Sequence, residues 1–140
     1  MMAGIGPKDT KPEMIVRKGL HGLGFRFRLH SRHLAGKPDL VLPKYRAAVF
    51  INGCFWHAHK DCSYFRLPKT RTEFWREKLA KNVERDQKNA QALITSGWRV
   101  LTVWECATKR FSLEDLLIAI AEWLRSKETS GELPNKRETI

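Results

Sequence analysis

The order of hydrophobic and polar residues along the chain predicts a first helix near the N-terminus. Residues 10–13 form a capping box, in which Thr10 is the N-cap, Pro12 lies in the first turn and Glu13 is the third helical residue. Apolar residues at helical spacing continue to about Leu23, and glycines on either side of this leucine end the pattern.

Three strands are predicted after this helix. Residues 25–30 alternate apolar and basic side chains, which favours a strand with one buried and one positively charged face. Residues 38–42 form a short apolar strand, and residues 47–51 are apolar throughout. A strand without alternation is typical of the centre of a sheet that is covered on both faces.

The second half of the chain predicts a helix, a strand and a helix. A long helix extends from Thr70 to about Ser96, and residues 98–104 form a strand. Residues 113–124 form an amphipathic helix with Ser112 as the N-cap. The buried stripe of the long helix is expected to consist of Phe74, Trp75, Leu79, Val83, Ala90, Leu93 and Ile94.

This order of elements predicts an α/β protein with one mixed central sheet flanked by helices on both sides. A length of 140 residues fits one domain. Residues 1–9 contain two glycines and a proline and are expected to form an arm, and residues 10–126 form the domain. The polar residues 127–140 are expected to be a disordered tail.

The charge of the chain indicates a polyanionic partner. Lysine and arginine outnumber aspartate and glutamate by 26 to 15, which gives a formal charge of +11. Nucleic acid is the first candidate for such a partner. A membrane is disfavoured, because no apolar run approaches the roughly 18 residues of a spanning helix and the N-terminus does not resemble a signal peptide. We expect a cytoplasmic monomer, since three cysteines without a secretory signal indicate a reducing compartment.

The segment after the central strand concentrates metal-ligand residues. Cys54, His57, His59 and Cys62 fall within nine positions, and the third cysteine is Cys106. Three thiolates and one imidazole form a ligand set that zinc prefers, although the spacing does not decide between the two histidines. Three buried free cysteines are the alternative, but the polar residues around them favour zinc. A redox pair is disfavoured because the chain has no C-x-x-C.

Asp39, which follows a proline at the start of a predicted strand, is a candidate ligand for a catalytic cation. Metal-dependent nucleases hold Mg²⁺ with carboxylates at adjacent strand ends. The usual acid-x-Lys pair on the next strand is absent, because Ile51 and Gly53 occupy those positions. On these residues alone, a turn-forming aspartate is the favoured interpretation.

Five motifs nevertheless make the chain resemble the very-short-patch-repair endonuclease family. They are N-G-C-F-W-H-A-H-K-D-C at 52–62, T-R-T-E-F-W at 70–75, K-N-V-E-R-D at 81–86, G-W-R-V at 97–100 and W-E-C at 104–106. The resemblance covers about residues 2–107. It implies a restriction-endonuclease-like α/β core that nicks one strand of duplex DNA beside a T:G mismatch, which arises when 5-methylcytosine is deaminated. Other mismatch-repair proteins are further possible partners.

The resemblance also implies roles for individual residues. Asp39 matches a catalytic ligand of Mg²⁺, for which the main-chain carbonyl of Ile51 is a second ligand. His57 matches a catalytic histidine, which can take a proton from the attacking water. The residues that match a structural zinc set are Cys54, His59, Cys62 and Cys106.

Five further positions are assigned in the same way, each with an ordinary structural alternative. Glu13 matches a catalytic glutamate but also completes the capping box, and Asp86 matches a supporting residue but could be a surface acid on a helix. Phe55, Trp56 and Met2 match side chains that wedge into the base stack, where core packing is the alternative. Separately, Asn52 departs from the histidine that some family members carry.

Two other functions remain open at this point. The chain could be a zinc-stabilised DNA-binding module without catalysis, or a sequence-specific restriction endonuclease that cuts both strands of matched DNA. Asp39, His57 and Glu13 discriminate against the first, because a protein that only binds DNA has no need to direct these groups at one phosphate.

Overall fold

The computed structural model describes residues 10–135, which form one mixed α/β unit. The helices are α1 (Lys11–Gly22), the short 3-10 turn η2 (Pro43–Tyr45), α2 (Thr72–Thr95), α3 (Glu105–Arg110) and α4 (Leu113–Arg125). The strands are β1 (Arg28–Leu29), β2 (Leu40–Leu42), β3 (Ala47–Asn52), β4 (Arg99–Trp104) and β5 (Ser130–Leu133). No helix within residues 10–135 is both long and apolar enough to span a bilayer.

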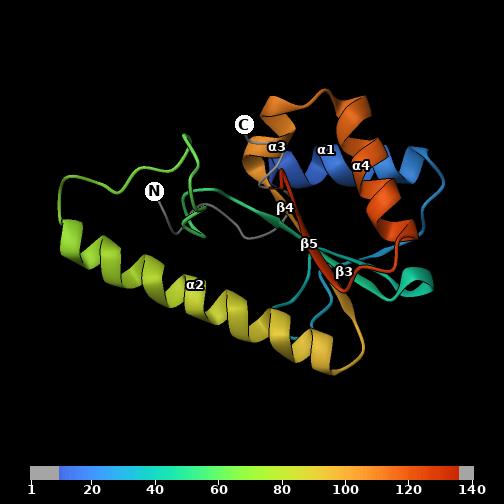
Figure 1. Cartoon of the computed structure of the whole chain (residues 1–140), viewed down its shortest axis with the longest axis horizontal. Coiled ribbons are helices and arrows are strands. Elements are labelled where there is room, and N and C mark those ends of the chain that lie inside the picture. The colour runs from blue at the N-terminus through green and yellow to red at the C-terminus, as the bar shows by residue number, and fades with distance from the viewer. Residues whose placement is uncertain (1–9, 136–140) are drawn as a thin grey trace.

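The five strands form one sheet in the order β1-β2-β3-β4-β5. The first three are antiparallel neighbours, whereas β4 runs parallel to both β3 and β5. Helices α1, α3 and α4 cover one face of the sheet and the long α2 lies on the other, as Figure 1 shows. The predicted mixed sheet with helices on both sides is therefore confirmed.

The central strand β3 explains this layering, because its alternate side chains enter two different cores. Ala47 and Val49 pack with residues of α1 and α4, in the larger core. Ala48 packs with Leu93 of α2, in the smaller one. All three β3 side chains are fully buried, as expected of an apolar strand that is covered on both faces.

The predicted N-caps of α1 and α4 are confirmed. The hydroxyl of Thr10 accepts a hydrogen bond from the backbone N–H of Glu13, and that of Ser112 accepts one from Asp115. These bonds satisfy N–H groups that have no partner inside the helix. The bond to Thr10 also fixes the backbone position from which the Glu13 side chain extends.

The prediction of a disordered tail from residue 127 is wrong for residues 130–133, which form β5. Val100 of β4 pairs with Ser130, and the side chain of Arg99 donates to the carbonyl of Glu128 just before the strand. Gly131 passes so close to the Trp123 ring that a Cβ there would collide with it. A strand of four residues held by such distant contacts carries little periodic signal of its own.

The structure differs from the predictions in three smaller respects. The strand expected at residues 25–30 is reduced to β1, both residues of which are exposed. Helix α3 follows β4 directly and was not expected. Phe74 was placed in the buried stripe of α2 but is 44% exposed, because the first turns of α2 extend beyond the sheet in Figure 1. The predicted arm, including Met2, and residues 136–140 lie outside the described residues.

Candidate active site and metal centre

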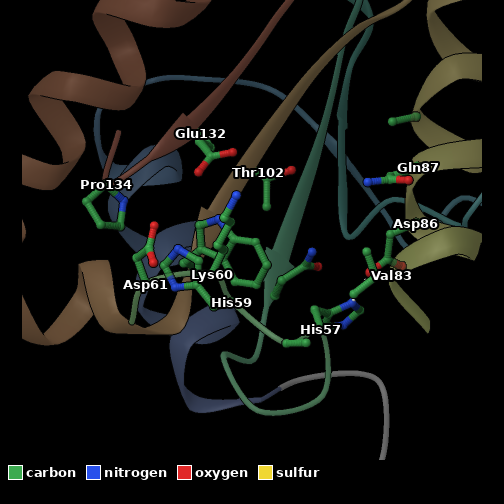
Figure 2. Close-up of a pocket in the computed structure, with 14 residues that line it drawn as sticks. His57, His59, Lys60, Asp61, Val83, Asp86, Gln87, Thr102, Glu132 and Pro134 are labelled. Atoms are coloured by element: carbon green, nitrogen blue, oxygen red, sulfur yellow. Dashed lines mark hydrogen bonds and ion pairs between the residues drawn. The ribbon is translucent and has the colours of Figure 1, made fainter. Parts of the chain in front are cut away.

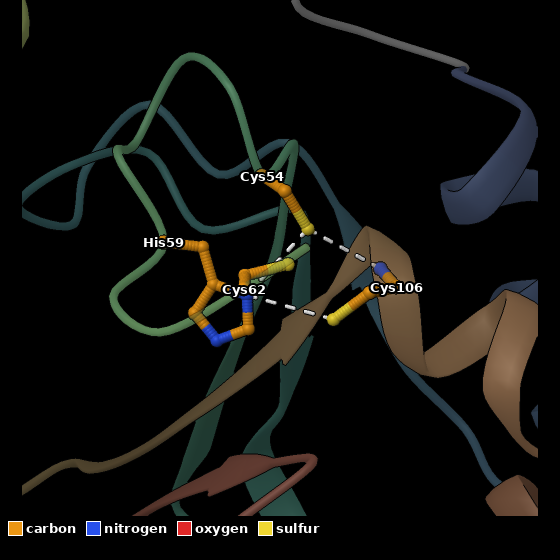
Figure 3. Close-up of side chains that lie close together, drawn as sticks. All are labelled: Cys54, His59, Cys62 and Cys106. Atoms are coloured by element: carbon orange, nitrogen blue, oxygen red, sulfur yellow. Dashed lines mark hydrogen bonds between the residues drawn. The ribbon is translucent and has the colours of Figure 1, made fainter. Parts of the chain in front are cut away.

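Three cysteines and one histidine converge beside the ends of β3 and β4. Cys54, His59 and Cys62 come from the loop after β3, and Cys106 lies in the first turn of α3 (Figure 3). Their ligand atoms all lie within 4.8 Å of one another. Nδ1 of His59 is 3.6 Å from Sγ of Cys54 and 3.5 Å from Sγ of Cys106. Ligands around a tetrahedral zinc ion are separated by roughly 3.6 Å, so this set fits such an ion.

Backbone N–H groups and an aromatic ring contact the ligands of the cluster. The backbone N–H of Cys106 donates to Sγ of Cys54 at 3.3 Å, and that of Tyr64 donates to Sγ of Cys62 at 3.4 Å. The ring of Trp104 stacks on His59 with a centroid distance of 3.9 Å and an interplanar angle of 6°. Outer contacts of this kind orient metal ligands.

Burial alters the protonation of the cluster. It raises the pKa of Cys54 to about 11 and also raises that of Cys106, since each thiolate would lie in an apolar interior near other sulfurs. Burial lowers the pKa of His59, which keeps its imidazole in the neutral form that binds metals. A positive ion among the ligands is what would hold the sulfurs as thiolates, so the donor set can hold a metal ion.

A cavity of about 810 Å³ opens next to this cluster, and Asp39, Ile51 and His57 all contribute to its lining. Asp39 lies just before β2, next to the central strand. Its Oδ2 accepts a hydrogen bond from the backbone N–H of Ile51 at 2.7 Å, which fixes the carboxylate against β3. The structure thus brings Asp39, Ile51 and His57 together at one site.

The environment of Asp39 raises its pKa from 3.8 to about 6. Burial is the largest cause, and the nearby charge of Glu13 adds to it. The Ile51 N–H and the two histidines His30 and His57 act in the opposite direction. A buried carboxylate close to a second carboxylate is suited to bind a divalent cation, because the cation would relieve both unfavourable effects.

Glu13 is part of the same site, although it also belongs to the cap of α1. Its side chain is 1% exposed, and Oε2 lies 2.9 Å from Nε2 of His30 and 3.1 Å from Nη1 of Arg17. Nδ1 of His30 is 3.9 Å from Oδ1 of Asp39. The backbone N–H of Glu13 makes the N-cap bond while its side chain faces His30, so this bond and an active-site role are compatible. Sequence reasoning missed His30, for which its place at the end of a predicted strand was the only signal.

His57 forms a close pair with Asp86 of α2. Its Nδ1 lies 2.5 Å from Oδ2 of Asp86, across 29 residues of sequence. The two side chains are 30% and 36% exposed, so water can reach them. Because Nδ1 faces the carboxylate, Nε2 is the ring nitrogen that can accept a proton. Asp86 is thus an acid on the surface of α2 whose side chain faces His57.

His57 also lines a second, smaller cavity of about 400 Å³ between the cysteine loop and α2. Figure 2 shows His57 next to Asp86 and Val83 of α2, with His59, Lys60 and Asp61 across the cavity. Asn52, which is 9% exposed, lines both cavities. His57 and Asn52 therefore separate two hollows on either side of the loop.

Phe55 and Trp56 are partly buried on the wall of the larger cavity. Their rings pack edge to face at 5.1 Å, and Trp75 of α2 lies 5.5 Å from Phe55 and 6.0 Å from Trp56. The side chain of Asn82 donates to the main-chain carbonyl of Trp56. The two rings are thus held by α2 and still face a cavity, so neither belongs to the main core.

Comparison with known proteins identifies the relatives of this chain. The sequence profile of the family described as "DNA mismatch endonuclease Vsr" matches residues 1–64. The DNA mismatch endonuclease Vsr of Escherichia coli is 42% identical over 135 residues, which are 94% of this chain and 86% of that protein. The type II nicking enzyme V.NmeAIP of Neisseria meningitidis is 50% identical over 109 residues, 78% of this chain and 77% of that protein. The type II nicking enzyme V.XorIIP of Xanthomonas oryzae is 46% identical over 106 residues, 76% of this chain and 77% of that protein.

Proposed function

The chain belongs to the family of the DNA mismatch endonuclease Vsr, and on this premise we propose that it nicks one strand of duplex DNA beside a T:G mismatch. It is a DNA endonuclease, as its relatives are. The proposed substrate is the mismatch left by deamination of 5-methylcytosine, and the proposed compartment is the cytoplasm, where that DNA lies. The mixed sheet with helices on both faces is compatible with a restriction-endonuclease-like core.

One observation supports catalysis more than any other: Asp39 and His57 line the same cavity although they come from different elements. A module that only binds DNA needs positive charge, which the net charge of +11 provides. It has no need of a buried carboxylate whose pKa is raised to about 6. Perturbed acids in a cavity are typical of active sites.

His57 would act as the general base. With its Nδ1 proton directed at Asp86, the imidazole presents the Nε2 lone pair to a water molecule in the cavity. Asp86 would hold this tautomer and stabilise the positive charge that the ring acquires. His57 would take a proton from the water as the water oxygen attacks the phosphorus, and one P–O ester bond of the phosphodiester would break.

Asp39 and the main-chain carbonyl of Ile51 would bind Mg²⁺. When bound, the ion supplies stabilisation of the negative charge that develops on the scissile phosphate. The hydrogen bond from the Ile51 N–H keeps the Asp39 carboxylate close to that carbonyl. Glu13 would add a second negative charge near the same position.

Cys54, His59, Cys62 and Cys106 would hold one structural Zn²⁺, which their geometry fits. Phe55, Trp56 and His57 lie between the first two of these ligands in the sequence. A metal that pins both ends of this segment would fix His57 in the active site. It would also hold the two aromatic rings ready to wedge into the base stack beside a mismatch.

A nicking assay tests the proposal. Duplexes that carry one T:G pair, with matched T:A and C:G duplexes as controls, are labelled on each strand in turn and incubated with and without Mg²⁺. We expect one strand of the T:G duplex to be nicked only with Mg²⁺. Asp39→Asn, a neutral replacement of the same shape, should be inactive. Equal nicking of all three duplexes, or cleavage of both strands, would overturn the proposal.

A further inference from the structure

His30 lies between the two carboxylates of the active site. Its Nε2 is 2.9 Å from Oε2 of Glu13, and its Nδ1 is 3.9 Å from Oδ1 of Asp39. Both are distances of ion pairs, which form when the imidazole is protonated, and the second contact is much the longer. The imidazole therefore contacts the Glu13 carboxylate and faces the Asp39 oxygen that does not accept from Ile51.

The backbone of His30 has an unfavourable conformation. Its φ of 49° lies in the left-handed region, which glycine and asparagine adopt more readily than other residues. The N–H of His30 donates to the carbonyl of Asp39 at 3.0 Å, so the pairing at this edge of the sheet sets the two residues opposite each other. Strained residues of this kind cluster at functional sites.

Arg17 contacts the same oxygen of Glu13 as His30 does. It lies one turn after Glu13 on α1, and its Nη1 is 3.1 Å from the same Oε2 atom that meets His30. The guanidinium of Arg17, which donates a hydrogen bond, and the imidazole of His30 thus contact the same carboxylate oxygen. Loss of the imidazole would remove the contact of this oxygen that lies on the Asp39 side and keep the one with Arg17 on α1.

We propose that His30 is a positioning residue of the active site, which holds Glu13 beside Asp39 and so sets the negative charge that receives the divalent cation. This inference rests on the proposed function, in which Asp39 binds that cation. His30 acts through the two carboxylates and does not need to touch DNA. Partners that orient metal-binding groups contribute 10-fold to 100-fold to metal affinity.

Two substitutions separate this role from a merely structural one. His30→Gln keeps a donor near the position of Nε2 but has a side chain that disfavours the left-handed conformation. His30→Asn accepts that conformation but is too short to reach Glu13. If His30 only shapes the turn, the asparagine variant should be the better one. If it positions Glu13, the glutamine variant should be the better one.

The experiment measures two quantities on the full chain. One is the Mg²⁺ concentration that gives half-maximal nicking of the T:G duplex. The other is the affinity for Mn²⁺ of the DNA-free protein, followed through the paramagnetic resonance signal of free Mn²⁺. His33→Asn, at an exposed histidine in the next loop, is the matched control. Thermal unfolding reports whether each variant is folded.

We expect His30→Asn to weaken both metal responses by about tenfold or more, which corresponds to about 1.4 kcal/mol. His30→Gln should recover most of this loss, and His33→Asn should match the wild type. DNA affinity should change little in any variant. Wild-type metal responses in a folded His30→Asn variant would overturn the proposal, as would a glutamine variant that is folded but no better than the asparagine one.

The controls distinguish this failure from failure of the proposed function. If the wild type nicks T:G duplex and Asp39→Asn does not, the active site stands whatever the His30 variants show. If the wild type does not nick, or Asp39→Asn remains active, the proposed site itself is wrong. Mn²⁺ binding to the DNA-free protein still tests the contact between His30 and Glu13 in that case.

Discussion

The proposed metal centre and the larger cavity, which is the proposed active site, both lie beside the end of β3 but are built in opposite ways. Cys54 and Cys106 are fully buried, and three of the four ligands come from one short loop. The cavity is lined from several separate elements, and its His57 is 30% exposed. One region is thus suited to hold the fold, whereas the other keeps its groups accessible to a substrate.

This difference predicts whether a substitution should affect the fold or the chemistry. Loss of a buried ligand leaves polar groups in the interior without their cation, so the fold should fail first. Loss of a cavity residue leaves a solvated gap, so the chemistry should fail while the fold survives. The loop with Phe55, Trp56 and His57 joins the two regions. Four predictions test this division, from the largest expected effect to the smallest.

Removal of one metal ligand should have the largest effect. Structural zinc contributes roughly 10–16 kcal/mol in small zinc domains, so Cys106→Ala and His59→Asn should lose the metal and unfold or aggregate. The wild type should contain about one zinc ion per chain by elemental analysis. His21→Asn, at an exposed histidine of α1, is the control for His59→Asn and should keep both metal and fold. Zinc-free protein that is folded and active would contradict the assignment.

Removal of the general base should abolish nicking without loss of the fold. General bases contribute roughly 100-fold to 10,000-fold to rate, so the nicking rate of His57→Ala should be at least 100-fold lower than that of the wild type. DNA affinity should stay within a few-fold, because it depends mainly on basic residues and counterion release. Single-turnover nicking and duplex binding measure the two effects. A His57→Ala variant that nicks at the wild-type rate would place the base elsewhere.

The sequence was most informative where the site is local. Nine neighbouring positions and one distant cysteine predicted a zinc set of three cysteines and one of two histidines, and the family resemblance chose His59. The structure brings those four side chains together. His30 was missed because its importance depends on the pairing that sets it opposite Asp39. His57 and Asp86 are 29 residues apart, so spacing alone could not show that Asp86 contacts His57. Strand β5 was missed for the same reason, since its partners are distant in sequence.

The ionised carboxylate of Asp39 in the cavity should lower the stability of the fold, whereas the metal centre should raise it. The pKa of Asp39 is raised from 3.8 to about 6 in the folded protein, so folding favours its protonated form. The corresponding stability is fully present below pH 3.8 and is lost as the pH rises through 6. Asp39→Asn keeps an acceptor for the Ile51 N–H but carries no charge. Without added Mg²⁺, we expect this variant to be more stable than the wild type at pH 7.5, by on the order of 1–3 kcal/mol. Thermal unfolding should show the difference shrink toward pH 4, and a pH-independent difference would contradict this account.

The smallest expected effect concerns the loop that joins the two regions. Trp56 lies between two proposed zinc ligands, packs on Trp75 and lines the cavity. A wedge that the metal holds rigid loses little conformational entropy when it enters DNA. Unstacking a base step costs less beside a mismatch than beside a matched pair.

Trp56→Ala should therefore lower the ratio of T:G to T:A nicking by about tenfold, which is about 1.4 kcal/mol of discrimination. Zinc content and binding to matched duplex should change much less. Phe74→Ala is the matched aromatic control, because Phe74 packs on the same Trp75 but is 44% exposed on the first turn of α2. If both variants kept the wild-type ratio, Trp56 would only pack the loop against α2, and the discrimination would come from other groups. If both lowered it equally, Trp75 and the packing of the whole cluster would set the preference. A loss confined to Trp56→Ala, with the metal still bound, would show that the metal centre supports a separate wedge.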